Sequence, residues 1–276
     1  LVELRADDGR FAPLVFDRPL APGVWRPTPP AMAPFFDPWL GQMDPFVVNS
    51  PTQFDPGAPP PIASNLYVEE FNEVRDYGVN VGSRRSPQQT ESALFFSDVG
   101  LGPLQAGLRD LVTRRGLDIS DSARLFAAVD LSLADDLFTV WRAKFDYGWW
   151  RPITAIREGN NDGNPSTVGD PGWTPLIPTP PYPDHTSGYN CATSSFMHTA
   201  EAFFGRGKAE FDVVRIAPGV PNVTRDYERF TDVIDDTIDA RVYQGLHFRS
   251  ADIQGARIGR QVAAWVDDHA FQPVDS

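Results

Sequence analysis

The chain has few of the residues that would tie it to a disulfide framework or to a membrane. Its 276 residues contain one cysteine, Cys191, so no intrachain disulfide can form. No apolar run approaches the ~20 residues needed to cross a bilayer. Lysine and arginine number 24 against 37 acidic residues, which gives a net charge of −13. These features predict a soluble protein without general affinity for nucleic acid or membrane, and they leave its compartment, export included, open.

Proline is concentrated near the start of the chain. Residues 10–63 hold 14 of the 27 prolines, and proline disfavours regular helix because it lacks an N–H group and restricts φ. The same stretch contains eight large aromatic residues, among them Phe16, Trp25, Phe35, Phe36, Trp39 and Phe46. Disordered segments are poor in aromatics. We therefore predict that residues 1–63 form an extended arm packed on the body of the protein, rather than a disordered tail.

From residue 64 onward, apolar residues recur at helical spacing. The pattern predicts helices over 64–77, 88–96, 103–115, 120–147, 187–204, 225–243 and 248–269, with a short strand over 211–216. Ser120 is the expected N-cap of the longest helix, and the Gly-, Asn- and Pro-rich residues 158–183 are an expected loop. The prediction is a mainly α fold in which residues 64–276 form a helical bundle with site residues on its facing helices.

Groups suited to binding a tetrahedral oxyanion occur in four segments of the second half. They are three cations, a Ser-Gly pair at a helix start and one imidazole: Lys144, Arg151, Arg241, Ser187, Gly188 and His247. Arginine and lysine bind phosphate-like oxygens by charge and hydrogen bonds, and a helix N-terminus offers free N–H groups. Histidine can act as nucleophile or metal ligand. Each segment alone also fits an ordinary structural role, so only their combination predicts an oxyanion site.

Glycines decide whether these groups can meet. Lys144 and Arg151 are two helical turns apart, and Gly148 between them can end the helix so that Arg151 reaches inward. Arg241 and His247 would point in different directions on a continuous helix. A break at Gly245 would let both face one pocket.

The spacing Lys-x6-Arg-Pro, then Ser-Gly, then Arg-x3-Gly-x-His resembles the vanadium-dependent haloperoxidases. That family shares its fold and site with type-2 phosphatidic acid phosphatases and bacterial class A acid phosphatases. Residues 241–249 carry the most specific similarity, and residues 22–30 and 71–74 extend it over nearly the whole chain. The resemblance implies that a helical portion normally precedes Leu1. The start of the chain also reads like the end of a helix, so we expect a piece of a longer protein.

The resemblance also implies a cofactor and its ligands. Vanadate would be the cofactor, with phosphate as a substitute, and His247 would be the apical ligand of vanadium. The three cations would neutralise the equatorial oxygens, while Ser187 and Gly188 would donate hydrogen bonds. Lys144 would in addition polarise a bound peroxide oxygen. The implied partners are hydrogen peroxide, a halide and an organic acceptor; the missing N-terminal portion and a second copy of the chain are further partners that the sequence leaves open.

Two aromatic residues are candidates for a halide pocket. Trp141 precedes Lys144 by about one helical turn, where the family can place an aromatic wall beside the halide. Tyr182 lies shortly before the Ser-Gly pair and can supply a second aromatic ring. Ordinary core packing is the alternative for both residues.

One position departs from the family pattern. The family has Pro-Ser-Gly-His, whose histidine is a general acid/base, whereas this chain has Thr186-Ser187-Gly188-Tyr189. Tyrosine exchanges protons poorly at neutral pH but can donate a hydrogen bond, so Tyr189 is a candidate catalytic residue of altered role. His185 is an alternative proton donor.

Three functions therefore remain open. They are a vanadate-dependent haloperoxidase or a variant of one with an altered acid/base residue, a phosphatase with a phosphohistidine at His247, and a non-catalytic or repurposed member of the fold.

Overall fold

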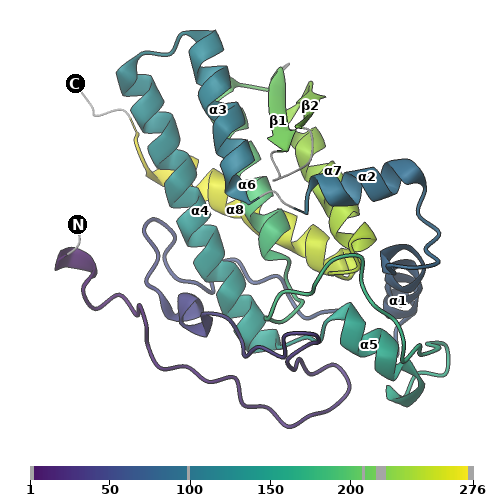
Figure 1. Ribbon diagram of the computed structural model, residues 1–276. Helices are drawn as coiled ribbons and strands as arrows, with labels where there is room; N and C mark the ends of the chain where they lie inside the picture. The colour runs from purple at the N-terminus through teal and green to yellow at the C-terminus, as the bar shows by residue number, and fades with distance from the viewer. Residues whose placement is uncertain (1–2, 98–99, 207–208, 216–221, 273–276) are drawn as a thin grey trace.

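The computed structural model describes residues 3–97, 100–206, 209–215 and 222–272, and it is mainly α-helical (Figure 1). The α-helices are α1 (Asn65–Gly78), α2 (Pro87–Phe95), α3 (Leu101–Arg115), α4 (Ile119–Tyr147), α5 (Pro152–Glu158), α6 (Gly188–Phe204), α7 (Phe230–Tyr243) and α8 (Arg249–His269). Short 3-10 helices are η1 (Glu3–Arg5), η2 (Pro38–Gln42) and η3 (Gly159–Asn161). This architecture confirms the predicted helical bundle. In the described part of the chain, no helix is long and apolar enough to cross a membrane.

Helix α6 lies at the centre of the bundle, in contact with α4, α7 and α8. Its closest neighbour is α8, where Gly255 and Gly259 face the backbone of α6 and a Cβ on either would collide with it. A hydrogen bond also joins the two helices, since the Ser187 N–H donates to the Ala251 carbonyl at 2.9 Å. The start of α6 is therefore held by a helix that is distant in sequence.

The longest helix begins differently from the prediction. The N-cap of α4 is Asp118, whose side chain accepts a hydrogen bond from the Asp121 N–H at 2.9 Å. The prediction that Ser120 caps this helix was wrong, because Ser120 already lies in its first turn. At the other end, α4 stops at Gly148, whose φ of 56° is accessible to glycine at little cost.

Two other elements also differ from the expectation. Residues 225–243 do not form one helix, because Val223–Tyr227 (β2) pairs antiparallel with Phe211–Arg215 (β1). Burial of Phe211 and Val213 in the main core favours the hairpin over a longer helix. The helix α5 was not predicted; it starts at Pro152, where proline fits the first helical position.

The arm before α1 contains only η1, η2 and extended or turn structure among its described residues, which confirms the proline-rich arm of the predicted fold (Figure 1). Its aromatic residues Trp25 and Phe35 are buried in a cluster that includes Val140 of α4 and Ile258 of α8. The division of the chain at residue 63 into an arm and a separate domain stays a prediction.

A buried carboxylate attaches the arm to the bundle. Asp135 of α4 is fully buried, and its two oxygens accept hydrogen bonds from the backbone N–H groups of Phe46, Val47 and Val48 at 2.6, 2.7 and 2.8 Å. Hydrogen bonds to a charged group are stronger than neutral ones. This one side chain therefore anchors the middle of the arm across α4.

Asp135→Ala should lower the free energy of unfolding by about 3 kcal/mol, because three buried N–H groups lose their acceptor. Chemical denaturation measures this change, and limited proteolysis should show faster cleavage within residues 44–57. Asp130→Ala, at an exposed position of the same helix, is the matched control. Equal effects of the two substitutions would contradict the anchoring role.

Candidate functional site

The six residues expected to bind an oxyanion converge at the ends of helices. We call them the oxyanion cluster: Lys144, Arg151, Ser187, Gly188, Arg241 and His247. Lys144 lies in the last turn of α4, Arg151 is the N-cap of α5, and Ser187 is the N-cap of α6. Arg241 lies in the last turn of α7, and His247 follows the break at Gly245, whose φ is 78°. The two glycine breaks that the sequence analysis required are both present.

Water is nearly excluded from the cluster. Lys144, Arg151 and Ser187 are fully buried, and His247 and Arg241 retain 1% and 6% of their exposure. Charged groups are rarely buried unless they are paired or bind a ligand. The burial of three cations side by side is therefore costly and calls for counter-charge.

Arg151 connects several parts of the cluster. Its Nε donates to the Tyr182 carbonyl at 2.7 Å and its Nη1 to the Leu246 carbonyl at 2.9 Å. The same Nη1 lies 3.1 Å from His247 Nε2 and 3.7 Å from Asp184 Oδ1. The guanidinium thus spans the loop before α6 and the turn that carries His247.

Asp184 is the counter-charge that the sequence analysis missed. It is fully buried, and its Oδ1 lies 2.8 Å from His247 Nδ1. Burial raises the pKa of the Asp184 carboxyl, and Arg151 and Lys144 oppose this rise by attraction. Only its place within the Pro-rich loop, directly before the helix start, could have suggested it from the sequence.

Lys144 is held by backbone carbonyls. Its Nζ donates to Pro183 O at 2.7 Å and to Asp184 O at 3.1 Å, and it lies 4.9 Å from the centre of the Tyr182 ring. Burial lowers the pKa of Lys144 well below its usual value, and repulsion by Arg151 lowers it further. A bound anion would favour the charged form, so anion binding and protonation of Lys144 should be coupled.

The imidazole of His247 is kept neutral. Burial lowers its pKa well below the usual value, and the charges of Arg151, Arg241 and Lys144 add to this effect. Neutral imidazole is the form that coordinates a metal or attacks an electrophile. The surroundings of His247 therefore favour either of the two roles considered for it.

Two guanidinium groups of the cluster have unpaired donor atoms. Arg151 Nη2 and Arg241 Nε are buried, and neither has a hydrogen-bond partner among the described residues. A buried, unpaired donor on a charged group is costly. A tetrahedral oxyanion would supply acceptors for both donors and negative charge in addition to that of Asp184. The donor set therefore fits a tetrahedral oxyanion such as vanadate or phosphate.

A metal site built from several protein ligands does not occur in the part of the chain that the structure describes. There, no group of three or more His, Cys, Asp and Glu side chains could hold a metal ion.

Arg241 is positioned by neighbours on both sides. Its Nη1 donates to Gln244 Oε1 at 2.8 Å, and its Cζ lies 4.9 Å from the centre of the Tyr189 ring. Such a cation–π contact orients the guanidinium. Burial raises the pKa of the Tyr189 hydroxyl, although Arg241 opposes the shift, so the hydroxyl stays protonated at neutral pH.

The start of α6 brings backbone close to an aromatic wall. Ser187 Oγ caps α6 by accepting a hydrogen bond from the Asn190 N–H at 3.4 Å. A Cβ on Gly188 would lie 3.2 Å from the Trp141 ring, which is tighter than ordinary contact. Trp141 in turn packs against Tyr182, with ring centres 5.1 Å apart. Trp141 and Tyr182 thus border the cluster; their role in a halide pocket stays a prediction.

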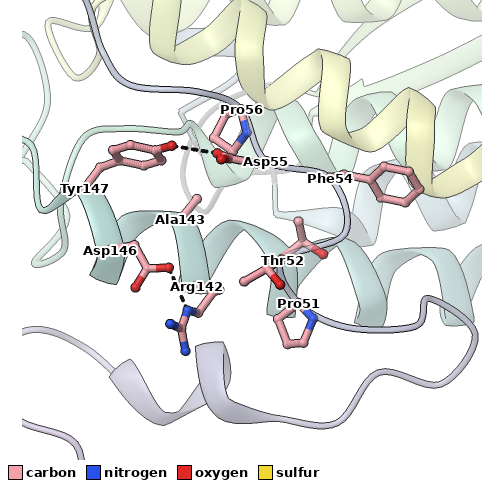
Figure 2. A pocket seen from close by; sticks show the side chains of 10 residues that line it. Pro51, Thr52, Phe54, Asp55, Pro56, Arg142, Ala143, Asp146 and Tyr147 are labelled. Carbon is pink, nitrogen blue, oxygen red and sulfur yellow. Dashed lines mark hydrogen bonds and ion pairs between the residues drawn. The ribbon is translucent and has the colours of Figure 1, made fainter.

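His185 contacts the arm. Its Nε2 lies 2.8 Å from the Gly57 carbonyl, its ring packs edge-on against Tyr147, and burial lowers its pKa to about 4. Figure 2 shows the adjacent pocket between the arm and α4, where the Tyr147 hydroxyl donates to Asp55 Oδ1 at 2.6 Å. None of the ten residues that line this pocket belongs to the oxyanion cluster. With so low a pKa, His185 is a poor general acid at neutral pH.

A second buried acid, Asp252 of α8, was also missed. Its Oδ1 accepts a hydrogen bond from Asn190 Nδ2 at 2.7 Å. Burial raises its pKa to about 7, and contacts with Ser187, Arg241 and Asn190 oppose the rise. The sequence offered no signal for it, since a single aspartate in an amphipathic helix normally faces water.

Asp252 should make stability depend on pH. Its pKa is raised in the fold, so between about pH 4 and 7 the folded chain binds more protons than the unfolded chain. The free energy of unfolding therefore falls as pH rises through this window, by at most about 1.4 kcal/mol per pH unit from this group. Asp252→Asn should flatten that decrease in denaturation curves measured from pH 4 to 8. Asp268→Asn, at an exposed position of the same helix, should leave it unchanged; the reverse result would contradict the assignment.

Comparisons with known proteins identify the family and the fold. The family model described as "VCPO second helical-bundle domain" matches residues 124–276. Vanadium chloroperoxidase from Curvularia inaequalis is 28% identical over 165 residues, which cover 48% of this chain and 26% of that protein. The chain thus spans about a quarter of the length of this relative.

Solved structures show the same fold. A bacterial vanadium-dependent iodoperoxidase superposes with a TM-score of 0.73 at 24% identity, over 91% of this chain and 62% of the other. An apo-type bacterial vanadium-dependent chloroperoxidase gives a TM-score of 0.77 at 15% identity, over 97% and 70%. Since the family model covers more than half of the chain and includes all six residues of the oxyanion cluster, the protein belongs to the vanadium haloperoxidase family.

Proposed function

We propose that the protein is a vanadate-dependent haloperoxidase that oxidises halide with hydrogen peroxide, in a form where Tyr189 replaces the usual acid/base histidine. The observation that carries the proposal is the pair of buried, unpartnered donors, Arg151 Nη2 and Arg241 Nε, beside the neutral His247. Family membership supports the choice of vanadate over other oxyanions. An organic acceptor would then be halogenated.

Each residue of the oxyanion cluster has a distinct role in this proposal. Arg151, Arg241 and Lys144 offset the charge of the oxyanion, and Ser187 and the Gly188 N–H donate hydrogen bonds to it. His247 supplies the ring nitrogen that would hold vanadium. When bound, vanadate acts as a Lewis acid that activates peroxide without changing oxidation state. Lys144, as a buried cation, would stabilise the negative charge that develops on the transferred oxygen.

The site lacks an efficient proton donor and acceptor at residue 189. The Tyr189 hydroxyl has a raised pKa and its ring lies against Arg241, so it can donate a hydrogen bond but exchanges protons slowly at neutral pH. The arrangement is consequently better suited to holding an anion than to moving protons around it.

A phosphatase acting through a phosphohistidine is the second candidate. The contact of Asp184 with His247 Nδ1 favours it, because a carboxylate there orients the ring as a nucleophile. The leaving alkoxide, however, needs a proton that Tyr189 provides poorly. A non-catalytic member of the fold is the third candidate.

Wild-type protein should bind orthovanadate and then brominate a phenolic dye in the presence of bromide and hydrogen peroxide. His247→Ala should weaken vanadate binding, measured by calorimetry, and lower bromination by at least about 100-fold, because the metal loses its protein ligand. His198→Ala on α6 is the matched control.

Hydrolysis of a simple phosphomonoester that is lost in His247→Ala would instead select the phosphatase. Absence of both activities together with intact vanadate binding would select the non-catalytic reading.

Tyr189→His should raise turnover of whichever reaction occurs, by about 10-fold or more, since a positioned general acid/base contributes typically 10²–10⁴-fold. The pH–rate profile should gain an ionisation near neutral pH. Tyr189→Phe removes only the hydroxyl and keeps the ring beside Arg241, so it separates the contribution of the hydroxyl from that of the ring. An unchanged rate and pH profile in Tyr189→His would show that residue 189 lies outside the reacting region.

A further inference from the structure

Helix α1 binds the segment that directly follows His247. Ser250 of α8 donates to Glu70 twice, from its N–H to Oε1 and from its hydroxyl to Oε2, both at 2.8 Å. Arg249 forms a two-pronged ion pair with Glu73, in which Nη2 lies 2.7 Å from Oε1 and Nε lies 3.0 Å from both carboxylate oxygens. Glu70 and Glu73 are three residues apart, so they lie on one face of α1. Two carboxylates of one helix thus bind two consecutive residues at the start of α8.

Phe248 adds an apolar contact to the same segment. Its side chain is 1% exposed and packs on Tyr67 of α1, with ring centres 5.6 Å apart. As the N-cap residue of α8, Phe248 has no polar side-chain group that could accept from the free N–H groups of the first turn. Glu70 supplies such an acceptor from a segment 180 residues away. The first turn of α8 therefore depends on α1 for its capping.

This use of a carboxylate is costly. Glu70 is 6% exposed, and burial raises the pKa of its carboxyl, although the two hydrogen bonds from Ser250 oppose the rise. A serine or aspartate at the N-cap would satisfy the same N–H group locally, without burial of a charge. A carboxylate from α1 does more than a local cap, because it also fixes where the first turn of α8 lies relative to α1.

His247 lies between two fixed points. On its N-terminal side, the Leu246 N–H donates to the Arg241 carbonyl at 3.2 Å, and the Leu246 carbonyl accepts from Arg151 Nη1 at 2.9 Å. On its C-terminal side, residues 248–250 are held by α1. A shift of residues 248–250 would therefore move the imidazole away from its contacts with Arg151 and Asp184.

We propose that Glu70, supported by Glu73, is a positioning residue that sets the place of the His247 ring in the oxyanion cluster through the first turn of α8. The proposal rests on the proposed function insofar as this ring is to bind vanadium. Helix α1 would then control cofactor affinity, although it contributes no member to the oxyanion cluster. Loss of a partner that orients a metal ligand typically costs roughly 10- to 100-fold in metal affinity.

The test compares affinity for orthovanadate with affinity for inorganic phosphate, both measured by calorimetry in the full chain. Vanadate would bind through its oxygens and through His247, whereas phosphate would bind through its oxygens alone. Glu70→Ala should therefore weaken vanadate binding by about 10-fold and change phosphate binding by less than about 2-fold. Glu70→Gln keeps an acceptor for the Ser250 N–H and should bind vanadate like wild type. Glu69→Ala, at an exposed position of α1, is the matched control.

A double-mutant cycle separates positioning from general damage. In a His247→Ala background, Glu70→Ala should have no further effect on vanadate affinity, because the ring that it positions is gone. Effects of the two substitutions that add would overturn the proposal, as would equal losses of vanadate and phosphate affinity in Glu70→Ala.

Glu73→Ala is the second variant if Glu70→Ala does not fold. Glu73 is partly exposed, and the substitution removes one of the two carboxylates that hold Arg249. Vanadate binding should weaken by about 3-fold, as expected for loss of a partly exposed ion pair, with phosphate binding unchanged. Unchanged vanadate binding would count against the proposal.

Imidazole NMR signals report the position of the ring without any ligand. The chain has four histidines, so the His247 signals are assigned by their loss in His247→Ala. Glu70→Ala should shift or broaden these signals and leave those of His198 and His269 unchanged; unaltered His247 signals would overturn the proposal. A wild type that binds no vanadate but shows the expected NMR change would refute the proposed function and leave the positioning role intact.

Discussion

Mutual repulsion among Lys144, Arg151 and Arg241 in a water-free space is the constraint on which the rest of the site depends. Burial and repulsion together lower the pKa of Lys144 and keep His247 neutral. Backbone carbonyls and the buried Asp184 offset part of the cost. The uncompensated positive charge would attract an anion, so the same charges that destabilise the fold would provide the binding energy of the proposed oxyanion.

Helix ends make this concentration of charge possible. Helices α4 and α7 end next to Gly148 and Gly245, so Arg151 and His247 are free to leave the direction of these helices. The start of α6 is held against α8 by close packing at Gly255, and the Ser187 N–H is bonded to α8. The arm adds a cover across α4, anchored by Asp135. Helices or helix starts therefore hold five of the six groups, and His247 lies in the buried turn between α7 and α8.

Much of the candidate site could be predicted because its chemistry is local in sequence. A lysine, two arginines, a Ser-Gly pair and a histidine show their residue types and spacing directly, and glycine signals the breaks. Asp184 and Asp252 could not be predicted in the same way, since a carboxylate has no local pattern that distinguishes a buried partner from a solvated one. Residues 223–227 were misjudged as helix for a similar reason: pairing with β1 and burial of the hairpin in the core outweigh local propensity.

By itself the sequence determined the mainly α class, the proline-rich arm, the helix periodicity, and the residue types of the oxyanion cluster. It did so because helical periodicity, proline geometry and glycine breaks act over a few residues. Only the tertiary structure decided which buried acids face the cations, that Tyr189 lies against Arg241, and that Asn190 links Ser187 to α7 and α8. Those contacts join residues distant in sequence, and burial, which no single segment encodes, sets their protonation and their polarity.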